Sequence, residues 1–138
     1  MARVIIILTT ILGAAMAANG IFMLSSPEIW FSVVPGVGRT GLFNQHFIRD
    51  IGILYIFIGG GFVYGALNPA YRLFLWTSAT LWLTCHAIFH YLEVMTGICS
   101  PSYLITEFPA VTLPAVIGVI ATLYALGSHR RNLAQHNK

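Results

Sequence analysis

Residues 45–67 read QHFIRDIGILYIFIGGGFVYGAL, a long apolar run in which Arg49 and Asp50 are the only charged side chains. A transmembrane helix needs about 20 mostly apolar residues to cross roughly 30 Å of hydrocarbon. The run therefore predicts a membrane span. Three further apolar stretches predict spans of their own, at residues 4–24, 73–97 and 110–126.

The composition supports an integral membrane protein. Of the 138 residues, 57% are hydrophobic and only 8% are charged, whereas about 25% of the residues are charged in a soluble globular domain. A water-soluble domain is therefore excluded, and so is intrinsic disorder, which has the opposite bias. Because the bilayer core offers the backbone no water, the spans should be helical. We predict one all-α domain over residues 1–138, an integral membrane four-helix bundle.

The basic residues predict which way the spans run. Lys and Arg accumulate in short cytoplasmic loops, and on the opposite side the sequence places Arg39 alone. Both termini should therefore be cytoplasmic. The net charge of +3 mostly reflects this anchoring to the lipid bilayer and predicts no nucleic-acid partner. The residues assigned to the cytoplasmic side are Arg3, Arg72, Arg130, Arg131 and Lys138.

Two helix-capping motifs are present in the predicted first outer loop. Ser26-Pro27-Glu28 offers an N-cap residue, a proline for the first helical position and an acid for the first turn. We expect a short interfacial helix after this motif, and Asn44 is a plausible cap for the second span.

Polar residues of different spans should meet near the outer surface. His46 and Asp50 lie in the first two turns of the second span, and His86, His90 and Glu93 lie in the last three turns of the third. The two spans run in opposite directions, so both sets fall at one depth. Spacings of four and seven residues place each set on one helix face.

This arrangement predicts a cofactor site. The candidate metal ligands are His46, Asp50, His86, His90 and Glu93, with Arg49 as the charge-balancing residue. Together they are one positive charge short of neutrality, which a protonated histidine, a protonated carboxyl or a bound cation would restore. Imidazole and carboxylate ligands suit Zn, Fe or Cu.

A b-type haem is the alternative cofactor. His46 would be one axial ligand, and His86 or His90 would be the other. Asn19, near the outer end of the first span, is a candidate polar neighbour of either site. No residue pattern specifies a reaction, so an enzymatic activity is left open.

Two other function classes remain. The chain could be a non-catalytic accessory subunit of a larger membrane complex, with the polar cluster acting as a staple between helices. It could also be a channel or transporter. That function would require an oligomer, because one four-helix bundle has little room for a pore. Each alternative predicts a homo-oligomer or a larger membrane complex as the working assembly.

Part of the sequence resembles a known group of proteins. The stretch Val34-Pro35-Gly36-Val37, followed by Thr40-Gly41-x-Phe43-Asn44-x-His46-Phe47-x-Arg49-Asp50-x-Gly52, is similar to a pattern in small four-span bacterial inner-membrane proteins of unknown function. His86-x-x-x-His90 also resembles their third helix. The resemblance implies a four-helix fold in a bacterial inner (plasma) membrane, and it implies no activity.

Overall fold

The computed structural model describes residues 2–39 and 41–136. The protein is 87% helical, and no strand occurs in these two ranges. This confirms the all-α prediction. The long helices are α1 (Ala2–Ser25), α3 (Gln45–Leu67), α4 (Pro69–Met95) and α6 (Leu113–His136).

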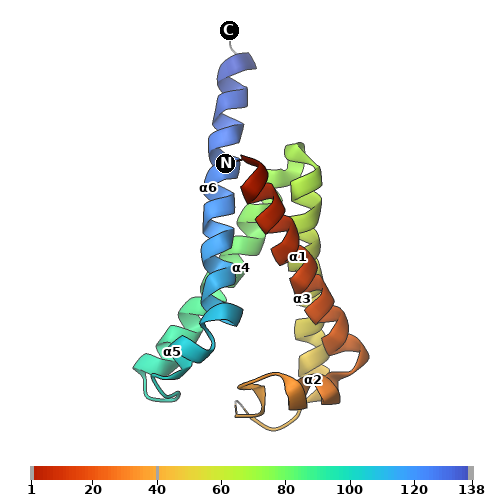
Figure 1. Ribbon diagram of the computed structural model, residues 1–138, viewed down its shortest axis with the longest axis vertical. Helices are drawn as coiled ribbons and strands as arrows, with labels where there is room; N and C mark the ends of the chain where they lie inside the picture. Colours follow the sequence, from red (N-terminus) through yellow and green to blue (C-terminus); the bar gives the residue numbers. More distant parts are fainter. Residues whose placement is uncertain (1, 40, 137–138) are drawn as a thin grey trace.

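Shorter elements connect the long helices at the end of the molecule opposite the termini (Figure 1). The first connection holds α2 (Pro27–Val33) and the 3₁₀ turn η1 (Val37–Arg39). The second holds α5 (Tyr103–Thr106) and the π-helical turn η2 (Phe108–Thr112). The short helix predicted after Ser26 is present as α2, with Pro27 in its first turn, but the Ser26 side chain makes no capping hydrogen bond. Asn44 caps α3 as expected, because its side chain accepts a hydrogen bond from the Phe47 backbone N–H at 3.0 Å.

Three segments within the described ranges are long and apolar enough to cross a membrane, namely residues 2–25, 45–67 and 108–135. They correspond to the first, second and fourth predicted spans. The predicted third span falls in α4, which is 27 residues long but is not among the three. The last helix also extends further than expected: the apolar run stops near Leu126, whereas α6 continues to His136. Hydropathy marks where a helix leaves hydrocarbon and carries no signal for where the helix itself ends.

Glycines bring α1 and α3 into direct backbone contact. Gly13 lies against the carbonyl of Gly59, where an added Cβ would sit 2.7 Å from that oxygen. Two turns away, Gly20 lies against the carbonyl of Gly52, and Gly52 lies against the carbonyl of Gly20. Small residues permit such close approach between membrane helices. Glycines seven residues apart therefore form the α1–α3 interface.

Arg72 does not lie in an inner loop, where the sequence analysis assigned it, because α4 begins earlier than predicted, at Pro69. The side chain is only 8% exposed. Its Nε donates to the carbonyl of Gly65 and its Nη2 to that of Ala66, both at 2.9 Å. The last carbonyls of a helix have no partner within the helix and attract cations. Arg72 therefore closes the end of α3.

The helices form two arms. Figure 1 shows α1 beside α3 and α4 beside α6, with the two pairs diverging toward α2 and α5. The arms are joined by a buried core around Phe62 and Trp76, and Trp76 Nε1 donates to the Phe62 carbonyl at 3.0 Å. Within the second arm, Thr122 donates to the hydroxyl of Thr80 at 3.0 Å. The polar residues predicted from the sequence lie toward the separated ends of these arms.

Candidate functional site

The first group of predicted site residues lies at the start of α3. His46 Nε2 is 3.3 Å from an Asp50 carboxylate oxygen, one turn along the same helix. Both side chains are open, with 89% and 57% of their surfaces exposed. Arg49 turns away from them, and its Nε donates to the carbonyl of Leu24 at 3.3 Å. Arg49 therefore fastens α3 to the end of α1.

The second group lies near the end of α4. His86 stacks on Trp82, with ring centroids 4.9 Å apart and planes within 11°. The His90 ring meets the edge of His86, with a centroid separation of 4.7 Å. Their four-residue spacing puts the two imidazoles side by side on one helix face. These two predicted residues are brought together as expected.

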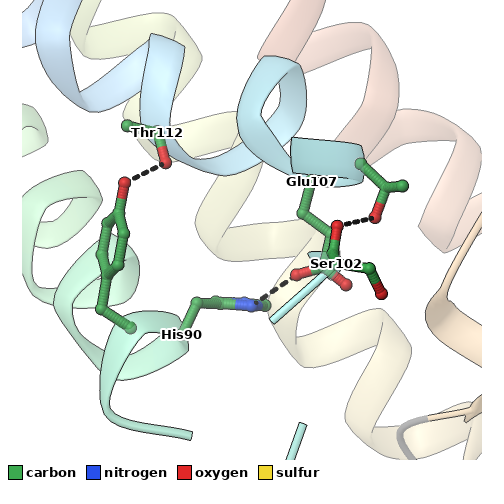
Figure 2. A network of polar contacts seen from close by, with 6 residues as sticks. His90, Ser102, Glu107 and Thr112 are labelled. Atoms are coloured by element: carbon green, nitrogen blue, oxygen red, sulfur yellow. Dashed lines mark hydrogen bonds and ion pairs between the residues drawn. The ribbon is translucent and has the colours of Figure 1, made fainter. Parts of the chain in front are cut away.

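A carboxylate from the connection between α4 and α6 holds His90 in place. The Nδ1 atom of His90 lies 2.9 Å from a Glu107 carboxylate oxygen, and both side chains are about three-quarters buried, at 24% and 23% exposed. Figure 2 shows the Glu107 side chain directed toward His90 from the segment between α5 and η2. Because this bond occupies Nδ1, the ring presents Nε2 to other groups.

The backbone around Glu107 is unusual. Glu107 is the C-cap of α5 and immediately precedes η2. Its carbonyl accepts from the N–H groups of both Ala110 and Val111, at 3.0 and 2.9 Å. The turn is pinned to α4 a second time by the bond between the Tyr91 and Thr112 hydroxyls, 3.2 Å long and visible in Figure 2. Such π-helical turns occur often at functional sites.

A half-buried thiol borders this group. His90, Cys99 and Glu107 all line one small cleft between α4 and the segment that connects it to α6. Burial raises the pKa of the Cys99 thiol, and the negative charges of Glu93 and Glu107 raise it further. The thiol is therefore kept protonated and weakly nucleophilic.

The predicted ligands are divided between the two arms. Within residues 2–39 and 41–136, no three His, Cys, Asp or Glu side chains are arranged to hold one metal ion. His46 pairs with Asp50 on the first arm, and His86 lies against His90 on the second. The start of α3 and the end of α4 lie toward the same end of the molecule, but the arms diverge there (Figure 1). Sequence spacing gives depth along a helix and says nothing about the angle between helices.

The remaining predicted residues have structural contacts. Asn19 accepts a hydrogen bond from Trp30 Nε1 at 2.9 Å, which ties α2 to α1. Glu93 lies on the second arm, and its carbonyl accepts from the N–H groups of Ile98 and Cys99 at the end of α4. Among the described residues, no ion pair joins Arg49 to Asp50, Glu93 or Glu107. The predicted charge balance by Arg49 therefore has no contact supporting it.

Sequence reasoning missed the partner of His90. The spacing pattern could not assign Glu107 to the site, because it lies seventeen residues from His90 in another segment of the chain. The only hint was an isolated acid followed closely by proline in an otherwise apolar segment. Comparisons with protein-family models, curated proteins and solved structures find no match to this chain.

Proposed function

We propose that the protein spans a bacterial inner membrane four times, with both termini in the cytoplasm. At about 1.5 Å per residue, α4 is roughly 40 Å long, enough to cross the hydrocarbon. It follows α3 after the single residue Asn68, so a membrane-spanning α3 obliges α4 to return through the bilayer. Arg3, Arg130 and Arg131 lie toward one end, which the positive-inside rule assigns to the cytoplasm. The bacterial membrane is supported by the sequence resemblance alone.

The proposed function is binding of one transition-metal ion at the outer side of the second arm. His86 and His90 would be its ligands, and Glu107 would orient His90. The observation that carries this proposal is the 2.9 Å contact between His90 Nδ1 and the Glu107 carboxylate, with the His86 ring alongside. A metal-binding histidine almost always donates its other ring N–H to a carboxylate, a carbonyl or water.

The donor chemistry favours a bare ion over haem. Adjacent histidines on one helix can share one ion, whereas axial haem ligands must approach from opposite faces of the ring. A haem between His46 and His90 would have to bridge the diverging arms. Zn, Cu or Fe would each accept two imidazoles. The remaining coordination positions are left for water, for Glu93 or for donors of a homo-oligomer, including the exposed His46–Asp50 pair.

The test uses protein purified in mild detergent from its native membrane. Elemental analysis should find near-stoichiometric metal, and the visible spectrum should contain no haem band. His90→Ala should lose the metal, and Glu107→Gln should weaken its binding by about 10- to 100-fold. His46→Ala is the matched control, since its imidazole lies on the other arm, and it should retain the metal. Metal retained in His90→Ala, or no metal in the native protein, would refute the proposal.

The accessory-subunit function is the second candidate, because the same contact ties α4 to the second outer connection. In that case the native protein would hold no metal, and His90→Ala would lower its stability. The projecting end of α6, which extends past the other helices in Figure 1, would then be a natural surface for a larger complex. Native mass in detergent separates this candidate from an oligomeric channel or transporter.

A further inference from the structure

The inner end of α6 carries positive charges that lie far from every acidic side chain of the sequence. Its last two turns include Arg130 and Arg131, and residues 129–135 are exposed. The four acidic residues of the sequence are Glu28, Asp50, Glu93 and Glu107. All four lie in or next to the connections at the opposite end of the molecule (Figure 1). The counter-ion for the inner end of α6 therefore comes from outside the chain.

The Arg131 side chain lies back along α6, toward the apolar part of the helix. Its Nη1 atom is 3.6 Å from the position that a Cβ of Gly127 would occupy. Helical side chains point toward the preceding turn, and the missing side chain at Gly127 leaves room for this arginine. Gly127 follows Leu126, where the apolar run ends, by one residue. The guanidinium would therefore lie within a few ångströms of the hydrocarbon edge, where the lipid head groups begin.

Arg131 also ends an apolar face of α6. Four positions precede it at intervals of three or four residues and share its side of the helix, namely Val116, Ile120, Leu123 and Gly127. The three large apolar side chains among them are exposed. Within residues 2–39 and 41–136, no ion pair involves Arg131. The surface is therefore an open apolar strip that ends at a cation, which matches an acyl chain that ends at a phosphate.

We propose that this face binds an anionic phospholipid, with the phosphate at the Arg131 guanidinium and one acyl chain along Leu123 and Ile120. A guanidinium can donate two parallel hydrogen bonds to a phosphate, and basic residues at a membrane surface attract anionic lipids. A zwitterionic head would also bring an ammonium group close to Arg130, with no carboxylate nearby to receive it, so a head with a net negative charge is favoured.

This inference rests on the proposed membrane placement of α6. It is independent of the proposed metal binding, because His86 and His90 lie on α4, toward the opposite end of the molecule.

The experiment uses native mass spectrometry of the whole protein in detergent micelles. Dioleoyl phosphatidylglycerol and dioleoyl phosphatidylcholine are titrated separately, and the dissociation constants of the first bound lipid are compared. The native protein should bind phosphatidylglycerol about fivefold more tightly, which is the effect of one basic residue near a membrane surface. Arg131→Gln should lose this preference, and Arg131→Lys should keep most of it because the positive charge remains.

Arg39→Gln is the matched control, because it removes the same charge from the first connection, at the opposite end of the molecule. It should keep the preference for phosphatidylglycerol. Equal affinities of the native protein for the two lipids would overturn the inference. A preference that survives in Arg131→Gln, or that is lost in Arg39→Gln, would overturn it too. So would displacement of phosphatidylglycerol by an equal concentration of inorganic phosphate, since the acyl chain would then contribute nothing.

A labelling experiment distinguishes failure of this inference from failure of the proposed membrane placement. Ser128→Cys, in a background with Cys85→Ser and Cys99→Ser, should react with a membrane-impermeant maleimide in inside-out membrane vesicles and not in right-side-out vesicles. Any other labelling pattern would overturn the placement and the inference together. The expected labelling without a lipid preference would overturn the inference alone. Metal content should be the same in the arginine variants and the native protein, so the metal proposal is tested separately.

Discussion

The glycine contact between α1 and α3 can be measured with two substitutions at adjacent positions. In Gly59→Ala, the new Cβ would lie 2.6 Å from the Ala17 backbone nitrogen and would press on the Gly13 carbonyl as well. Neither neighbour is a flexible side chain. Ordinary contact begins at 3.4 Å, so moving from 2.6 to 3.4 Å requires the helices to separate by about 0.8 Å. Overpacking of this kind costs about 1–3 kcal/mol.

Gly60→Ala isolates that cost. Both substitutions replace glycine by alanine inside one helix, and each gains about 1 kcal/mol of helix propensity. Only Gly59 faces α1, whereas an added Cβ at Gly60 meets nothing within 4 Å. The propensity gain cancels in the comparison. The free energy of unfolding should therefore be about 1–3 kcal/mol lower for Gly59→Ala than for Gly60→Ala.

The assay is unfolding by sodium dodecyl sulfate in mixed micelles, followed by circular dichroism, with both variants measured at one protein concentration. Gly60→Ala should be at least as stable as the native protein. Equal midpoints for the two variants would refute the reasoning, because the close approach of the backbones would then contribute nothing to stability.

Arg72→Leu should lower the free energy of unfolding by about 3 kcal/mol, because it leaves the carbonyls of Gly65 and Ala66 unpaired. Arg72→Lys should lose less of this free energy. Native-like stability of Arg72→Leu in the same detergent assay would contradict this role. In a Cys85→Ser background, alkylation of Cys99 should reach half its maximal rate at a higher pH than that of a free cysteine, because a raised pKa delays formation of the thiolate. Glu107→Gln should move this midpoint to lower pH, whereas Glu28→Gln should leave it unchanged. An alkylation midpoint at or below that of free cysteine would show that burial and the nearby carboxylates do not raise the pKa of the Cys99 thiol.

The helical fold was predictable because hydropathy and capping act locally. The stretch 45–67 coincides with α3, and Asn44 caps it as its side-chain chemistry suggests. The separation of the arms was not predictable, because it depends on which residues of α1 and α4 face α3. The backbone contact of α3 with α1, for example, uses Gly52 and Gly59 and not the other glycines of the helix.

The candidate site was predictable only along each helix. The four-residue spacing correctly placed His86 beside His90, and His46 beside Asp50. It could not find Glu107, whose position depends on the path of a connection that ends in a π-helical turn. Hydropathy, in turn, placed Arg72 in a loop. An arginine between two apolar runs gives the same hydropathy profile whether its side chain is solvated or bound to backbone carbonyls.

The hydrogen bonds of Arg72 bear on how the protein enters its membrane. A helical hairpin carries exposed carbonyls at its turn, and lipid offers them no donor. In this protein the hairpin of α3 and α4 satisfies those groups with its own side chain, only a few residues into the second helix. A membrane-inserted hairpin of α3 and α4 would therefore need no donor from α1 or α6 for these two carbonyls.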